Sequence, residues 1–216
     1  MEKLEAEKAA AARRKRLQLV FASVLVVALL AGGGVAAAVL LGGDDEPEVA
    51  AGAASIPALK TGDVKEAAKL AGCKYEPKVA NEGAGHEEKD FKASDYKQNP
   101  PTSGNHHPTW YEDGIYAPGD TPELGRLVHT LEHGRIDIQY KPGTSPETVA
   151  QLETLYNEMD GGHHLLLFEN TTGMSAAVAA TAWDASLTCP TMKPEVFDAI
   201  RGFRKEHIDK GPEIVP

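Results

Sequence analysis

The sequence has 216 residues, of which 42% are hydrophobic and 25% charged, and its formal net charge is −10 at pH 7. Residues 1–43 carry six basic and three acidic side chains, so the rest of the chain has a net charge of −13. Such an acidic domain is a poor partner for nucleic acid, whose binding depends on neutralising phosphates, and for an anionic membrane surface. The negative sign by itself indicates solubility rather than a particular ligand.

An uncharged segment from Leu17 to Leu41 follows a short basic tail. A helix rises about 1.5 Å per residue, so these 25 residues are long enough to cross a hydrocarbon core roughly 30 Å thick. Arg13-Arg14-Lys15-Arg16 precede the segment and Asp44-Asp45-Glu46 follow it. Because positive flanks stay in the cytoplasm, we predict a cytoplasmic tail at 1–16, a single transmembrane helix at 17–41 and an extracytoplasmic C-terminal part.

A cleaved signal peptide is the alternative for this segment, with Ala36-Ala37-Ala38 as the cleavage site. The apolar run is longer than the roughly 7–15 residues usual in signal peptides, which favours a retained anchor. In both cases the remainder of the chain leaves the cytoplasm. We therefore expect the protein at the cell membrane, with its N-terminus inside and its C-terminal domain outside.

Residues 42–60 are small, acidic and interrupted by proline, which is typical of a flexible linker. Residues 61–216 are enough for one domain with its own core. This domain contains the only two cysteines, Cys73 and Cys189, and an oxidising compartment favours a disulfide between them. A role as metal ligands or as a redox pair is the alternative, although neither cysteine lies in a Cys-x-x-Cys motif.

Up to about Gly119 the domain is rich in turn residues, and its second half shows regular periodicity. Thr121-Pro122 predict the start of a helix that ends before Gly134, with the apolar residues on one face. A strand at 136–140, a helix from Ser145 to about Met159, strands at 164–168 and 176–181 and a last helix from Pro194 follow.

With a short strand near Ile115-Tyr116, the predicted order is β-α-β-α-β-β-α. This order matches the thioredoxin-like topology without its Cys-x-x-Cys motif. We expect an α+β fold in which helices flank a small mixed sheet.

Seven of the eight histidines lie between His86 and His164, and the most informative are His129 and His133. On a helix, residues four apart share one face and can chelate one ion. A helical wheel places these two at about 140° and 180° from the apolar face, so they are not core residues of that face. Gly125 lies one turn before His129 and leaves room for another segment to approach.

The segment Pro100–Pro108 is the candidate for that approach, because prolines stiffen it and Gly104 allows an unusual turn. His106 or His107 would then complete a site with His129 and His133, and His86 is a further candidate ligand. Three imidazoles with an open fourth position suit copper or zinc. The alternative is that the helical pair is solvated or hydrogen-bonded and has only a structural role.

Three functions remain open from the residues alone. The first is metal handling at the envelope by a tethered domain. The second is a structural or assembly partner of envelope proteins, with Trp110-Tyr111 as the contact surface. The third is a zinc hydrolase, because His129-Thr130-Leu131-Glu132-His133 matches the His-x-x-Glu-His motif, with Glu132 as base and Glu195 or Glu206 as third ligand.

Several separated blocks resemble an uncharacterised bacterial family, the domain of unknown function 3105, which occurs in membrane-anchored exported proteins. The blocks are Pro-Pro-Thr-Ser-Gly-Asn-His-His from Pro100, Val128–Gly134, Ile138–Tyr140, Thr181–Trp183 and Gly211–Glu213. Cys73, His86 and Cys189 also stand where the family pattern places them. The resemblance covers roughly Cys73 to Glu213 and implies an anchor and an exported domain, without an established activity.

Overall fold

The computed structural model describes residues 53–213. The predicted cytoplasmic tail, the transmembrane helix and most of the linker lie outside these residues. Within the described part, no helix is both long and apolar enough to cross a membrane.

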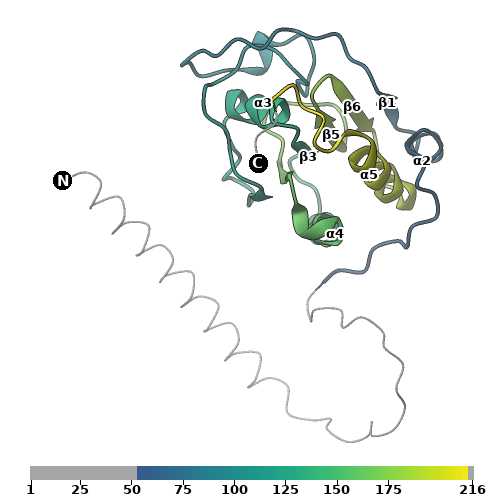
Figure 1. The fold of residues 1–216 in the computed structure, drawn as a ribbon. Helices are drawn as coiled ribbons and strands as arrows, with labels where there is room; N and C mark the ends of the chain where they lie inside the picture. Colours follow the sequence, from purple (N-terminus) through teal and green to yellow (C-terminus); the bar gives the residue numbers. More distant parts are fainter. Residues whose placement is uncertain (1–52, 214–216) are drawn as a thin grey trace, which may run out of the picture. The chain divides into compact units, whose positions relative to one another are not determined.

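The described residues form a mixed α+β fold, which confirms the predicted class (Figure 1). Its helices are α2 (Val64–Ala71), α3 (Leu124–Glu132), α4 (Pro146–Glu158) and α5 (Pro194–His207). Its strands are β1 (Lys74–Glu76), β2 (Gly114–Ile115), β3 (Ile136–Tyr140), β4 (Leu165–Glu169), β5 (Val178–Ala182) and β6 (Ala185–Cys189). All six strands belong to one sheet in the order β1-β6-β5-β3-β4-β2. Strands β2 and β3 run parallel to β4, and the remaining pairs are antiparallel.

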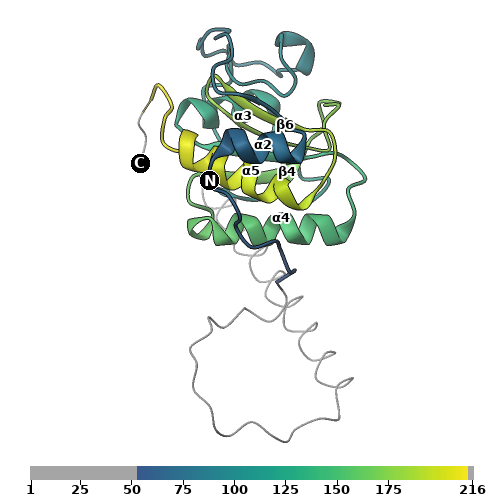
Figure 2. The same cartoon turned by 90° about the vertical axis from the view of Figure 1, so that its right-hand side faces the viewer.

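The two faces of the sheet carry different layers. Alternate side chains of a strand point to opposite faces, so Ile136 and Ile138 join the main core with α2, α4 and α5. On the other face, Leu166 and Phe168 of β4 pack against Leu127 of α3. Figure 2 shows α2, α4 and α5 in front of the sheet and α3 behind it. Helix α3 is therefore the only α-helix of the described part on its face of the sheet.

The predicted helix boundaries agree with the structure at α4 and differ at α3. Ser145 caps α4 by accepting a hydrogen bond from the Thr148 N–H, and Pro146 occupies the first helical position. Helix α3 begins at Leu124, and the predicted cap at Thr121 is wrong. The Thr121 hydroxyl donates instead to the Glu169 carbonyl across 2.8 Å, which ties the loop to β4.

Strand β6 pairs with β5 and with β1, and neither β6 nor β1 is predicted from the sequence. A two-residue connection, Trp183-Asp184, joins β5 to β6. The disulfide predicted between Cys73 and Cys189 is present, with the two Cα atoms 4.2 Å apart. It ties the end of α2 to the end of β6.

Candidate metal centre

Helix α3 is buried on more than one side. Leu127 faces the sheet, while Val128 packs against Phe91 and Tyr96 of the loop region that precedes α3. His129, Glu132 and His133 are each no more than 4% exposed, so the alternative of a solvated histidine pair is wrong. The loop region covers the flank of α3 that carries these three residues.

Thr130 fixes α3 to the sheet on the opposite flank. Its hydroxyl lies 2.6 Å from the Leu127 carbonyl and 3.1 Å from a carboxylate oxygen of Asp137. A hydroxyl has one proton, so it donates to only one of them. Burial raises the pKa of Asp137, and the protonated acid can donate to Thr130 while Thr130 donates to Leu127. This link sets the rotation of α3 and keeps its histidines turned away from the sheet.

Two segments of the loop region, one at His86 and one at His106, lie side by side against α3. His86 and His106 form a parallel bridge, with the His106 N–H 2.9 Å from the Gly85 carbonyl and the Glu87 N–H 2.8 Å from the His106 carbonyl. The His107 N–H then donates to the Gly125 carbonyl of α3 across 3.3 Å.

Gly125 permits this close approach, as its sequence position predicts. A Cβ atom there would lie only 2.4 Å from the Phe91 ring. The Phe91 side chain of the loop region can therefore pack directly against the helix, beside the segment whose His107 N–H donates to the Gly125 carbonyl.

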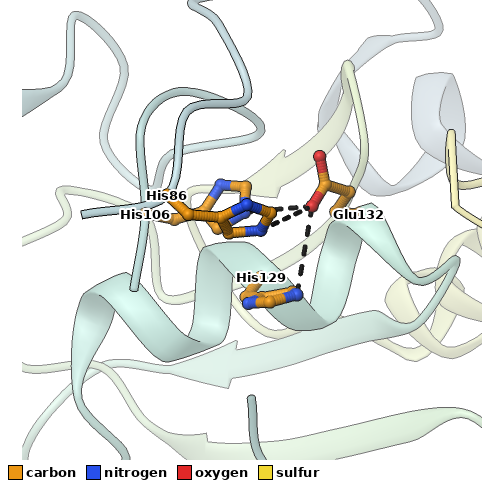
Figure 3. Close-up of side chains that lie close together, drawn as sticks. All are labelled: His86, His106, His129 and Glu132. Carbon is orange, nitrogen blue, oxygen red and sulfur yellow. Dashed lines mark hydrogen bonds and ion pairs between the residues drawn. The ribbon is translucent and has the colours of Figure 1, made fainter. Parts of the chain in front are cut away.

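His86, His106, His129 and Glu132 converge at this contact (Figure 3). The Glu132 Oε2 atom lies 3.0 Å from His106 Nε2, 3.4 Å from His86 Nε2 and 4.0 Å from His129 Nε2. All four ligand atoms lie within 4.8 Å of one another. Ligands of a tetrahedral zinc ion stand about 3.3–3.5 Å apart, since each bond is about 2.0–2.2 Å long. The group therefore has the dimensions of a metal site.

Hydrogen bonds to the main chain fix the tautomers of two rings. His106 Nδ1 lies 2.8 Å from the Gly104 carbonyl, and His129 Nδ1 lies 2.6 Å from the His107 carbonyl. A carbonyl oxygen only accepts, so each Nδ1 carries the proton and donates it. Each neutral ring then has its lone pair on Nε2. This atom lies 3.0 Å from Glu132 Oε2 in His106 and 4.0 Å from it in His129, whose nearer neighbour is His133 Nε2 at 3.0 Å.

Because both rings are buried, adding a proton to either Nε2 atom costs free energy. Burial lowers the pKa of His106 and of His129, because the charged imidazolium loses its hydration. It also raises the pKa of Glu132, with the neighbouring Glu213 carboxylate as a further cause. One proton on Glu132 would serve His106, while His129 Nε2 lies 3.0 Å from His133 Nε2 and can accept the proton of that ring in its Nε2–H tautomer. A metal cation can accept both lone pairs at once.

A second group shares two of these residues and consists of His129, Glu132, His133 and Glu213. His133 Nε2 lies 3.0 Å from His129 Nε2 and 3.5 Å from Glu213 Oε2. Desolvation, with His129 and Arg135 as further causes, lowers the pKa of His133 to about 4. His133 is therefore a neutral imidazole at physiological pH.

Glu213 reaches the site from the C-terminal segment that follows α5. Its N–H donates to the Glu132 carbonyl across 3.0 Å, and the Asp209 N–H donates to the Gly134 carbonyl across 2.9 Å. Glu213 is not among the acidic ligands predicted from the sequence. Those are Glu195 and Glu206, and they belong to none of the ligand groups in the described residues. The Gly211-Pro212-Glu213 block of the family resemblance is the signal that could have found it.

The structure thus brings His86, His106, His129 and His133 into neighbouring ligand groups. The ring of His107 is not part of them. Its Nδ1 lies 2.9 Å from the Thr109 hydroxyl and accepts from the Thr109 N–H, and only its carbonyl reaches the site through His129. The proline-bordered segment thus contributes the side chain of His106 and, from the next residue, the main-chain carbonyl of His107.

A third group, Asp113, His163 and His164, is already committed to other bonds. The Asp113 carboxylate accepts from Arg135 Nε and from the His164 N–H, each across 2.8 Å. With both oxygens occupied, it is a weaker candidate than the centre on α3.

The only two tryptophans of the sequence flank the histidines. The Trp110 ring lies 4.5 Å from the His133 ring and 5.3 Å from the His129 ring, centroid to centroid. The Trp183 ring lies 6.0 Å from the His106 ring. These indoles give the site an apolar border, which lowers the local dielectric and strengthens any ion–ligand attraction.

Comparison with known families matches residues 87–215 to the family described as protein of unknown function (DUF3105). The matched range includes His106, His129, Glu132, His133 and Glu213, and it begins one residue after His86. Neither the curated proteins nor the solved structures gave a match.

Proposed function

Because the chain belongs to the DUF3105 family, whose function is unknown, its role must be inferred from the site, and we propose a membrane-tethered extracytoplasmic metal-binding protein. The proposed ligand is a first-row transition-metal ion, copper or zinc, and the proposed role is metal handling at the cell envelope. The observation that carries this proposal is the convergence of one ligand atom each from His86, His106, His129 and Glu132 within 4.8 Å of one another.

The donor set supports a borderline divalent ion. Imidazole suits zinc and copper, and a carboxylate is compatible with both. Both cysteines are bound in the disulfide, so no thiolate is available to favour a softer ion. The carbonyls that hold His106 and His129 orient the rings, as outer partners of metal-bound histidines do in other proteins.

The direct test is a metal titration of the full-length chain, kept in a mild detergent because the sequence predicts a membrane segment. We expect His106→Ala and His129→Ala to weaken Zn²⁺ binding at least about 100-fold, since loss of a ligand costs more than loss of an outer partner. His107→Ala is the matched control, because its ring lies outside the ligand groups. Equal binding by all three variants and the wild type would contradict the proposal.

The tether is proposed from the sequence. The apolar segment at 17–41 and its basic flank support a single span with the N-terminus in the cytoplasm. Past the predicted span, the described chain contacts the domain from Ser55 onwards. The Ser55 carbonyl accepts from Gln151 of α4, and the Pro57 carbonyl accepts from Arg201 of α5.

A zinc hydrolase is the second candidate, favoured by one observation. Glu213 stands next to His133, so the His-x-x-Glu-His motif has a downstream acidic residue within ligand distance. However, Glu132 lies among three imidazoles, where it acts as a ligand and not as a free base. Hydrolysis that Glu132→Gln abolishes without loss of metal would favour the hydrolase.

The assembly role receives less support from the structure. Trp110 packs against His129 and His133 and is 37% exposed, so much of its ring serves the histidine site. Its neighbour Tyr111 packs edge-on against Tyr116. A contact surface built on these two aromatic residues would therefore compete with their internal contacts.

We also propose that β3-α4-β4-β5-β6-α5 is a thioredoxin-like core. Parallel β3 and β4 are joined by α4, and an antiparallel β5-β6 pair leads into the last helix. In this order the chain between β3 and α4 is Lys141–Ser145 and contains no cysteine. The core would then act as a scaffold for the metal centre and not as a thiol redox site.

A further inference from the structure

The two ligand groups on α3 together contain six side chains, which are more than a tetrahedral ion uses. They are His86, His106, His129, Glu132, His133 and Glu213. Within each group every pair of ligand atoms lies within 4.8 Å, whereas the six do not form one such group. His86 and His106 stand at one end, His133 and Glu213 stand at the other, and His129 and Glu132 lie between them.

His129 can coordinate an ion at only one of the two ends of this cluster. Its Nδ1 proton is donated to the His107 carbonyl, so its Nε2 has a single lone pair to offer. An ion bound by His86, His106, His129 and Glu132 uses that lone pair. His133, whose Nε2 lies 3.0 Å away, then finds neither a donor nor an acceptor on His129.

With the first ion bound to His129, His133 has no ordinary hydrogen-bond partner in the described residues. Its Nδ1 is buried and has no hydrogen bond. Its Nε2 is 3.5 Å from Glu213 Oε2, longer than the roughly 2.7–3.2 Å of an ordinary hydrogen bond. That separation instead fits two ligands of one ion, which stand about 3.3–3.5 Å apart.

The carboxylates at this end are suited to hold a cation. The Glu213 N–H is bonded to the Glu132 carbonyl, which keeps the two glutamates together although their charges repel. The Glu132 carboxylate has a second oxygen besides the one that faces the three imidazoles, and carboxylates commonly bridge paired ions. The Glu213 side chain is 51% exposed, so this end has access to solvent.

We propose that the site binds two ions, an inference that rests on the metal binding proposed above. His86, His106, His129 and Glu132 hold the first ion in a closed set of four ligands. His133, Glu213 and the other oxygen of Glu132 hold a second divalent transition-metal ion. Three protein ligands leave this second ion a position for water, as in open metal sites. Glu132 bridges the pair.

The test is the number of ions per chain. Full-length wild type and variants are dialysed against saturating Zn²⁺, and the metal-to-chain ratio is measured by plasma mass spectrometry. We expect a ratio of two for the wild type and of one for His133→Ala and Glu213→Gln. Glu213→Gln changes a half-exposed side chain, so it provides a result even if His133→Ala fails to fold. Glu147→Gln, at an exposed acid of α4, is the control and should keep a ratio of two.

Each other outcome has a distinct meaning. A wild-type ratio of one that Glu213→Gln leaves unchanged would overturn the second position and leave the first intact. A ratio of one that falls to zero in both His106→Ala and His133→Ala would mean that a single ion is shared, which also overturns the inference. A ratio of zero in the wild type would overturn the proposed function itself.

Discussion

His106 and His129 are set apart from ordinary surface histidines by where their protons lie. Main-chain carbonyls hold the proton on Nδ1 of each ring, and burial opposes a second proton on Nε2. The same backbone that brings the loop to α3 therefore also prepares the ligands. No metal is needed to choose the tautomer, which reduces the reorganisation that binding requires.

The first residue-scale prediction concerns pH. Protons compete with a metal at a histidine below its pKa, and burial lowers the pKa of His106, His129 and His133. Protonation of these imidazoles should thus weaken binding only below the usual histidine pKa of about 6.5, while the raised pKa of Glu132 brings protonation of this carboxylate to a higher pH than for an ordinary glutamate. Competition titrations with a chelator at several pH values measure this. An affinity that already falls steeply between about pH 7.5 and pH 6.5 would contradict it.

The second residue-scale prediction concerns Gly125. An added methyl group would lie 2.4 Å from the Phe91 ring and push the loop away from α3. Overpacking costs about 1–3 kcal/mol, and replacing a helical glycine by alanine recovers about 1 kcal/mol. We expect Gly125→Ala to lower the free energy of unfolding by up to about 2 kcal/mol and to weaken metal binding.

Urea unfolding and metal titration together test this expectation. Gly62→Ala is the matched control, because nothing lies within 4 Å of its added Cβ. Unchanged metal affinity in Gly125→Ala would show that the loop does not need this close approach.

Among the elements, the disulfide between Cys73 and Cys189 joins the segment after α2 to the end of β6. It closes a loop of 116 residues, for which the chain-entropy model gives about 4–5 kcal/mol of stabilisation. We expect reduction, or Cys73→Ala with Cys189→Ala, to lower the free energy of unfolding by up to that amount. Urea unfolding under oxidising and reducing conditions measures the difference. Identical unfolding midpoints in the two conditions would contradict the prediction.

Elements with local signals could be predicted from the sequence, and elements defined by distant contacts could not. Helix α4 has a serine cap and a proline at its first position, and both signals lie within the helix start itself. Strand β6 is held between β5 and β1, and its sequence Ala185–Cys189 has only weak strand preference.

The same division applies to the candidate site. His129 and His133 are recognisable because their spacing is a property of one helix. His86 becomes a clear candidate only through its bridge to His106, 20 residues further along the chain. Glu213 is brought to His133 by the path of the chain after α5, which periodicity does not reveal. The buried lone pairs likewise depend on carbonyl positions that only the structure provides.

For the whole molecule, we predict that the C-terminal domain lies on the extracytoplasmic side of the membrane. We expect an alkaline phosphatase fused after Pro216 to be active, since this enzyme folds correctly only outside the cytoplasm. Exchanging the basic residues Arg13–Arg16 for glutamate should reduce that activity by disturbing the orientation of the segment at 17–41. Exchanging Lys3 and Lys8, which lie farther from the apolar segment, is the control. Equal activity in all fusions would argue against orientation by the basic flank.

Both tryptophan rings lie beside the histidines, so the intrinsic fluorescence of the protein should respond to metal binding. The chain has no other tryptophan, so its intrinsic fluorescence arises almost entirely within a few ångströms of the imidazoles. An open-shell ion such as Cu²⁺ would quench that emission at contact range, whereas Zn²⁺, with its filled d shell, would change the emission only modestly. Emission intensity alone would therefore distinguish the two ions, without a label and in the presence of lipid.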